Sequence, residues 1–318
     1  MLNNNSIAVI IAAYNSENTI GRAIESVINE DNVKQIIIVD DCSSDNTFEI
    51  ATCYKNQNDK VSVYSTSTNS GPSKARNIAL NKATCDWVTV LDSDDYIESG
   101  RFKKLLSYSD GYELIADDQY RVYEHDKTTK KTEMLGAKQC FPVTISLAEF
   151  IESNITKEGQ YRKELGFIKP IIKLDFLLKH RLTYQEAMRL GEDYELYCRC
   201  LALGAKLKLI EASGYVAVVR EASLSGSHSK QDLIQLRDCN YEIINRMPLE
   251  PQEKKLMIQH ADSINIKIQW IDFYSSVKSR NCKMVIKSFF NSYSAFKFIL
   301  KNLKEQFAIR ILKRSGGK

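Results

Sequence analysis

Three carboxylates end a short apolar run in Trp87–Tyr96, WVTVLDSDDY. Asp92, Asp94 and Asp95 are so close in sequence that their charges repel one another unless a cation compensates them. A hard divalent cation such as Mg²⁺ or Mn²⁺, which keeps part of its water shell and bridges to phosphate oxygens, would do so. The alternative is an acidic loop in which Ser93 and the acids only cap the next helix. The spacing alone leaves both interpretations open.

A second acidic pair, Glu192 and Asp193, follows Gly191 at the start of a predicted helix. Apolar residues recur after it at helical spacing, at Tyr194, Leu196, Tyr197, Cys200, Leu201 and Leu203. The helix dipole stabilises acids at a helix N-terminus, so plain capping would explain the pair. It is nevertheless the second element at which we expect chemistry.

The first half of the chain predicts a scaffold for these acids. Four apolar runs are expected strands: Ser6–Ala13, Gln35–Val39, Val61–Ser65 and Trp87–Leu91. Helices are expected between them, with Ile20, Ala23, Ile24, Val27 and Ile28 on one face of the first, an Asp45 or Asn46 cap on the second and the third spanning Lys74 to about Ala83. This alternation predicts βαβ units in a mostly parallel sheet.

One edge of this sheet collects polar side chains. The carboxyl ends of parallel strands meet there, which brings together Tyr14, Asp40, Asp41, Arg76 and the acidic cluster. Nucleotides bind at such an edge, but neither GxGxxG after the first strand nor GxxxxGK[ST] occurs. A diphosphate would therefore have to be held by metal and arginine.

The second half is less regular. We expect strands at Glu113–Ala116, Gln119–Tyr123, Lys206–Ile210 and Tyr215–Arg220, with a hairpin-like polar tip at His125–Lys131. A helix is expected at Leu147–Ile155, a mobile loop near the acceptor at 156–166, and a segment packed on the sheet at Ile168–Leu178. Helical patterns then cover Gln231–Arg246 and Gln252–Ser276.

Five fragments occur in the order and spacing of the family 2 inverting glycosyltransferases: VIIAAYN, IIIVDDCSSDNT, NSGPSKARNIAL, VTVLDSDD and LGEDYELYCRCLALG. The resemblance covers roughly residues 6–225 and implies the GT-A fold and a nucleotide-diphosphate sugar donor. Within the family, AAYNS with the following TI and AIES, and YVAVVREASLSGSHS, are most similar to bacterial exopolysaccharide enzymes of the succinoglycan type.

The resemblance implies roles on the nucleotide side. Tyr14 resembles the residue that flanks the nucleobase, and Asp41 the acceptor for the ring N–H of the base. Asp40 and Asp41 would otherwise only cap their loop. Arg76 resembles the arginine that approaches the nucleotide, with a structural pair to Asp92 or Asp94 as the alternative.

Asp92 resembles the ribose contact, whereas Asp94 and Asp95 resemble the carboxylates on the metal side. The resemblance does not decide which of those two contacts the cation.

The resemblance also implies the groups that act on the reacting atoms. Asp193 resembles the general base, which a sugar hydroxyl needs because it is a poor nucleophile, and Glu192 would orient the acceptor. Arg220 and His228 are placed to close over the diphosphate, and His228 would complete the metal shell, unless it is simply a solvated loop histidine.

Composition sets the setting for this chemistry. The chain has 318 residues, which suits one large domain, or a domain of about 220 residues with an appendage. Its eight cysteines are scattered without a CxxC pair, as in a reduced cytosolic protein, and zinc is not expected. There is no apparent signal peptide and no run long enough to span a membrane.

Charge is uneven along the chain. The segment from Lys278 to Lys318 carries +10 and the remainder −6, so no nucleic-acid partner is expected. Apolar residues in this tail recur in steps of three and four, at Ile286, Phe289, Tyr293, Phe296, Leu300, Leu303 and Phe307. A basic amphipathic helix of this kind binds an anionic membrane surface or packs on the catalytic domain or a second copy, and both remain open.

We therefore predict a GT-A catalytic domain at 1–230, with a nucleotide-binding half at 1–107 and an acceptor-binding half at 108–230, and a helical extension at 231–318. The resemblance implies transfer of a sugar, with UDP as the expected nucleotide and a glycan or lipid-linked glycan as acceptor. The expected location is cytoplasmic, peripheral on the inner face of the membrane.

Three other functions are alternatives to this one. A catalytically degenerate family member could bind glycans or scaffold a synthase complex, although acids are present at both sites. A pyrophosphorylase would need a Gly-rich loop after the first strand, and a processive synthase would need membrane spans and a QxxRW motif; the sequence has none of these.

Overall fold

The first half of the chain forms the parallel part of a large central sheet. The computed structural model describes residues 5–124, 130–136, 139–157, 162–220, 228–289, 296–301 and 303–304. The strands β1 (Ile7–Ala13), β2 (Val33–Asp40), β3 (Val61–Ser65) and β4 (Trp87–Val90) lie in the order β3-β2-β1-β4, all parallel. The predicted strands and their parallel arrangement are confirmed.

Helices cover both faces of this half. Successive residues of β1 point to opposite faces, so Ile7, Val9 and Ile11 pack under α1 (Ile20–Ile28) and α2 (Thr47–Gln57). Ala8 and Ile10 face the core under α3 (Pro72–Leu80). This helix begins earlier than predicted because Pro72 suits a first helical position and Gly71 adopts a φ of +90° before it.

The rest of the large sheet is mixed. β10 (Ile171–Lys173) runs antiparallel between β4 and β6 (Leu114–Asp117), β11 (Leu207–Ile210) is parallel to β6, and β9 (Val143–Ile145) is an antiparallel edge. The segment 168–178, expected to pack on the sheet, instead supplies one of its strands, β10, and then begins a helix at Leu174. The eight-stranded sheet remains mainly parallel.

A second sheet of four strands was not predicted. Its order is β5-β12-β7-β8, formed by β5 (Tyr96–Ile97), β12 (Tyr215–Val219), β7 (Tyr120–Tyr123) and β8 (Thr132–Glu133). The antiparallel pair β7 and β8 flanks the expected hairpin tip, of which residues 125–129 lie outside the described residues. β5 follows the acidic cluster directly, so this sheet places one side of that cluster.

Short helices lie between the strands that follow β5. They are α4 (Arg101–Leu106), α5 (Leu147–Asn154), the 3₁₀ turn Leu165–Phe167, α6 (Leu174–Lys179) and α7 (Glu192–Ala202). α5 starts with a reciprocal cap in which Ser146 and Glu149 bond to each other's backbone N–H. Part of the loop expected at 156–166, residues 158–161, lies outside the described residues.

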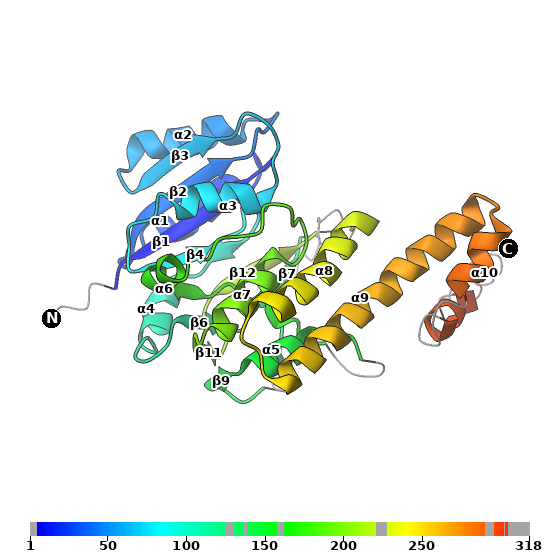
Figure 1. Ribbon diagram of the computed structural model, residues 1–318. Coiled ribbons are helices and arrows are strands. Elements are labelled where there is room, and N and C mark those ends of the chain that lie inside the picture. The colour runs from blue at the N-terminus through cyan, green and yellow to red at the C-terminus, as the bar shows by residue number, and fades with distance from the viewer. Residues whose placement is uncertain are drawn as a thin grey trace.

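The described part of the C-terminal extension includes α8 (Lys230–Arg246), α9 (Pro251–Lys278), α10 (Cys282–Phe289) and a helical segment at 296–301. α9 packs on α5 and α8, and its outer half leaves the body and carries α10 at its end (Figure 1). Cys239 and Met257 belong to the same buried core as Leu196 of α7. The division at residue 230 stays a prediction, and the residues on its two sides share one core.

The aromatic residues of the tail pack on α9. Phe289 lies 5.8 Å from Phe273 and 4.9 Å from Phe296, while Phe298 meets Trp270 edge-on at 6.4 Å between ring centroids. These contacts support the packing alternative for that part of the stripe. Ile286 and Leu303 are exposed, whereas Tyr293 and Phe307 lie outside the described residues. Within the described residues, no helix combines the length and apolar character that crossing a bilayer requires.

Candidate active site

Two buried cations and three carboxylates meet at the carboxyl edge of the sheet. Arg76 bonds to Asp92 Oδ1 at 2.8 Å and to Glu192 Oε1 at 2.7 Å. Lys169 Nζ lies 2.9 Å from Asp92 Oδ2 and 2.6 Å from Asp193 Oδ2. This charge cluster (Arg76, Lys169, Asp92, Glu192 and Asp193) joins residues from four separate parts of the chain.

Arg76 is placed by α3, one turn after Pro72. Its guanidinium lies 5.4 Å from the ring centroid of Tyr184, and its Nε is buried without a hydrogen-bond partner. The structure thus realises the pair with Asp92 that was the structural alternative for Arg76. A direct contact of Arg76 with the nucleotide stays a prediction.

Lys169 is the member of the charge cluster that sequence analysis missed. It lies in the apolar run GFIKPIIK, where a single lysine is typical of a residue at the end of a strand. Burial would lower its pKa, but the charges of Asp193 and Asp92 outweigh this and raise it. Burial likewise opposes ionisation of Asp92, yet Lys169 and Arg76 lower the pKa of Asp92 to about 2.

The acidic pair is set by Gly191, which precedes α7 with a φ of +73°. The positive φ favours glycine, and a Cβ at this position would meet Leu236 Cδ1 of α8 at 2.4 Å, so a larger residue would also force this leucine to shift. Glu192 and Asp193 then project from the first turn into the charge cluster. The base role of Asp193 and the acceptor role of Glu192 stay predictions.

Asp94 and Asp95 differ in their surroundings. Both oxygens of Asp95 are used by β12, with Tyr215 donating to Oδ2 at 2.8 Å and the Val218 N–H to Oδ1 at 2.9 Å. Burial, and then the charges of Asp92 and Asp94, raise the pKa of Asp95 to about 7. Asp95, one of the two carboxylates expected on the metal side, is therefore hydrogen-bonded to β12 of the second sheet. No local sequence pattern predicts this contact.

Within the described residues, the Asp94 carboxylate accepts a hydrogen bond from its own backbone N–H, and its main-chain carbonyl accepts from Arg22 at 2.5 Å. Burial and then Asp92 raise the pKa of Asp94, and Arg220 opposes the rise. In the described residues, Arg220 Nε and Nη2 are buried without hydrogen-bond partners, and Nε makes one long ion pair, with Glu124 at 3.5 Å. A carboxylate and a guanidinium with this little engagement suit a metal-bound diphosphate.

We tested the donor set against a divalent cation. The described part of the chain contains no group of three or more His, Cys, Asp or Glu side chains arranged to hold a metal. One carboxylate, Asp94, nevertheless fits a cation whose other ligands are phosphate oxygens and water, the way Mg²⁺ is commonly bound. His228 is half-buried and makes no hydrogen bond or ion pair with these acids in the described residues.

The residues expected around the base lie along the ends of β1 and β2. Tyr14 is 47 % exposed, so its ring is open to a ligand. Asp41 accepts hydrogen bonds from Thr66 Oγ1, Ser70 N and Gly71 N at 2.7–3.0 Å, which ties it to the loop before α3. The structure supports the loop-holding alternative for Asp41, and its contact with a base stays a prediction.

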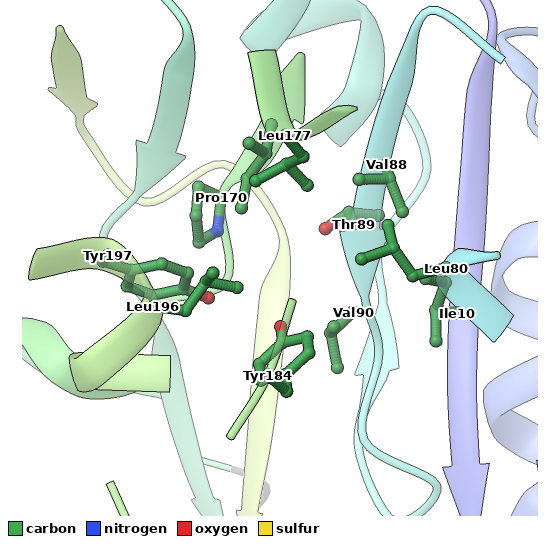
Figure 2. Close-up of a pocket in the computed structure, with 11 residues that line it drawn as sticks. Ile10, Leu80, Val88, Thr89, Val90, Pro170, Leu177, Tyr184, Leu196 and Tyr197 are labelled. Carbon is green, nitrogen blue, oxygen red and sulfur yellow. The ribbon is translucent and has the colours of Figure 1, made fainter. Parts of the chain in front are cut away.

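A small apolar cavity with room for about one water molecule lies behind the charge cluster, between β4 and α7. Figure 2 shows Thr89 directing its hydroxyl into this cavity, opposite Pro170 and between Tyr184 and Val88. Thr89 Oγ1 is buried without a hydrogen-bond partner in the described structure. The cavity is too small and too apolar for a sugar.

Comparisons with known proteins agree on one family. The family model described as Glycosyl transferase family 2 matches residues 8–171. The chain is 36% identical over 258 residues to the succinoglycan biosynthesis protein ExoU of Rhizobium meliloti (strain 1021), covering 81% of this chain and 75% of ExoU. It is 28% identical over 307 residues to ExoO of the same organism, covering 96% of this chain and 86% of ExoO.

A solved structure gives the same fold. S. aureus TarS 1–349 in complex with UDP-GlcNAc matches with a TM-score of 0.64 and 23% identity, over 82% of this chain and 73% of that chain. At 23% identity, the similarity to TarS supports the fold and nothing further. The predicted GT-A architecture is confirmed.

Proposed function

Because the chain belongs to glycosyl transferase family 2, we propose that it moves a sugar from a nucleotide-diphosphate donor to a hydroxyl of a growing bacterial surface or exopolysaccharide glycan, with inversion. The observation that carries the proposal is the charge cluster. It unites Asp92, at the nucleotide-binding strand end, with the Glu192–Asp193 pair at the start of α7.

The donor is expected to be a UDP-sugar. TarS of S. aureus has been solved with UDP and with UDP-GlcNAc, and ExoU is named for succinoglycan biosynthesis. Tyr14 would flank the base and Arg76 would approach the nucleotide, while Asp92, held from both sides by cations, would receive the ribose. Arg220, whose one ion pair in the described residues is the long contact with Glu124 at 3.5 Å, would bind the diphosphate.

Asp193 is the proposed general base. It would accept the proton of the acceptor hydroxyl while the hydroxyl oxygen attacks C1 from the face opposite the leaving group, which inverts the anomeric centre. Glu192 would orient the acceptor. A divalent cation held by Asp94 would supply positive charge next to the departing diphosphate, and Arg220 would add to it.

The extension is proposed to hold the enzyme on the anionic inner face of the cell membrane, where a lipid-linked acceptor would lie. Lys283, Lys287 and Lys301 are exposed on α10 and the following helical segment, and Ile286 is also exposed. Basic side chains near such a surface contribute about 1 kcal/mol each. This location is cytoplasmic and peripheral.

One screen tests the enzymatic proposal against the degenerate-member alternative. Purified protein is incubated with a panel of nucleotide sugars and extracts of lipid-linked glycan, with and without Mn²⁺, and release of nucleoside diphosphate is measured. We expect release with one donor class that Asp193→Asn abolishes. Binding of a nucleotide sugar without turnover under any condition would favour the glycan-binding or scaffold alternative.

A further inference from the structure

The two oxygens of Asp193 are held unequally. Oδ2 accepts a short hydrogen bond of 2.6 Å from Lys169 Nζ. Oδ1 lies 3.4 Å from Arg76 Nη1, a distance at which a hydrogen bond is weak. A carboxylate that is anchored through one oxygen presents the other in a fixed direction.

Lys169 is itself held rigidly. Its main-chain carbonyl accepts a hydrogen bond of 2.5 Å from Arg101 Nη2, and Arg101 is fully buried in an ion pair of 2.8 Å with Asp117. Pro170 follows Lys169 and leads directly into β10. The backbone of Lys169 is thus fixed from α4 and β6, so its side chain reaches the charge cluster from a defined origin.

The ammonium of Lys169 also spans the two ends of the site. Besides Asp193 it contacts Asp92 Oδ2 at 2.9 Å, and its side chain is 7% exposed. Asp92 keeps a second cation, Arg76, at 2.8 Å. Loss of the lysine would therefore leave Asp92 paired, but would leave Asp193 with its long contact to Arg76 and the hydroxyl of Tyr184.

We propose that Lys169 is a positioning residue that anchors Asp193 through Oδ2 and reserves Oδ1 for the proton of the acceptor hydroxyl. This inference rests on the proposed function, in which Asp193 is the base. The proton of the acceptor hydroxyl moves to Asp193 Oδ1 while the hydroxyl oxygen bonds to C1 of the donor sugar. The bond between C1 and the diphosphate oxygen breaks, and its electron pair leaves with the diphosphate. Lys169 keeps its own proton throughout.

The test compares full-length variants in the transfer assay. Lys169→Met removes the ammonium group but keeps a side chain of similar length, and Lys169→Arg keeps the positive charge. Lys173→Met is the matched control, since it removes a lysine four residues away whose long ion pair with Glu113, at 3.7 Å, is half-exposed. Asp193→Asn and the double variant Lys169→Met/Asp193→Asn complete a double-mutant cycle with the wild type and Lys169→Met.

We expect Lys169→Met to lower kcat by about 10²-fold, within the range of a general base, while the donor KM changes by less than about threefold. Lys169→Arg should recover most of that loss, and Lys173→Met should match the wild type. In the Asp193→Asn background, Lys169→Met should cost less than about threefold, because both changes remove the same function.

The outcomes separate the two proposals. If Asp193→Asn retains kcat within tenfold, the base assignment of the proposed function is wrong. If Asp193→Asn is severely impaired but the losses of the two variants multiply, or if Lys169→Met raises the donor KM with kcat unchanged, the positioning role of Lys169 is wrong. Should Lys169→Met not fold by circular dichroism, Lys169→Gln, neutral and of similar length, takes its place in the same cycle.

Discussion

The hydroxyl of Tyr194 donates a hydrogen bond to Asn240 Oδ1 across 3.0 Å. Tyr194 follows Asp193 on α7, and Asn240 lies in the middle of α8. The same oxygen meets His260 Nδ1 of α9 at 2.9 Å, and Asn240 is fully buried. The extension is thereby bonded to the helix that carries the proposed base.

Replacing Asn240 should weaken the whole catalytic domain. Asn240→Leu keeps the size of the side chain but leaves two buried donors, on Tyr194 and His260, without their acceptor. We expect the free energy of unfolding to fall by about 2–4 kcal/mol, measured by urea denaturation. Glu242→Ala, which removes a surface pair with Arg246 at 3.8 Å, should cost less than about 1 kcal/mol. Equal effects of both changes would contradict the anchoring role.

The same network predicts a pH dependence of stability. Burial, then the positive charges of Arg162 and Lys267, lower the pKa of His260 from 6.5 to about 3. Between these values the unfolded chain binds a proton at this histidine and the folded chain does not. The free energy of unfolding is therefore not lowered by His260 above pH 6.5. Between pH 6.5 and pH 3 it falls with acid, by up to about 1.4 kcal/mol per pH unit.

Urea denaturation at pH 7.5, 6 and 5 measures this contribution. His260→Gln has no group that titrates here, so its stability should fall less steeply with acid than that of the wild type. Parallel curves for the two proteins would show that His260 is not the source of the acid sensitivity.

The predictable part of the fold came from local pattern. The apolar runs of β1 to β4 and the helical spacing between them gave the parallel half of the sheet, since burial on both faces leaves a strong local signal. Two strands of the second sheet, β7 and β12, were predicted, but their assembly into a sheet was not, because β5 and β8 are two residues long and β12 pairs with β5 across more than a hundred positions. Its effect on Asp95 could not be anticipated either.

The candidate site divides in the same way. Asp92, Asp193 and Arg76 were found from their places at strand and helix ends, where sequence spacing has geometric meaning. Lys169 was missed because its role depends on Asp92 and Asp193, 77 and 24 positions away. A lone lysine inside GFIKPIIK was the one available signal, since lysine is rarely buried without a partner.

Asp193→Asn tests the base. The amide cannot accept the acceptor proton, so kcat should fall by about 10²–10⁴-fold while binding of UDP, measured by calorimetry, is nearly unchanged. Asp175→Asn is the control, an exposed acid in the first turn of α6. A loss of less than tenfold would place the base elsewhere.

Substitutions at Asp94 and Asp95 should have different effects: the first on metal binding, the second on stability. EDTA should abolish transfer and Mn²⁺ or Mg²⁺ restore it; full activity of metal-free protein would exclude the metal role. Asp94→Asn should raise the Mn²⁺ concentration needed for half-maximal rate, with thermal stability retained, because the hydrogen bond that the described residues give this carboxylate comes from its own backbone N–H. Asp95→Ala should instead destabilise the protein by about 1–3 kcal/mol, since it strips acceptors from Tyr215 and Val218.

The extension can be tested for membrane binding without disturbing its packing. Lys283, Lys287 and Lys301 are exposed, whereas Phe289 and Phe298 contact α9, so Lys→Glu changes at the three lysines should leave the fold intact. The wild type should bind liposomes that contain anionic lipid at low salt and be released at high salt, because screening shortens the range of the attraction. The triple variant should not bind.

Lys55→Glu, Lys103→Glu and Lys179→Glu make a control with the same change of net charge, since these exposed lysines lie on the catalytic body. This control should still bind, because the attraction decays within about 10 Å of the membrane surface. Equal loss in both triple variants would mean that net charge, not the extension, sets the affinity. No binding by the wild type would leave α9 and α10 as a packing element alone, since Phe289 already contacts Phe273 of α9 and Phe296.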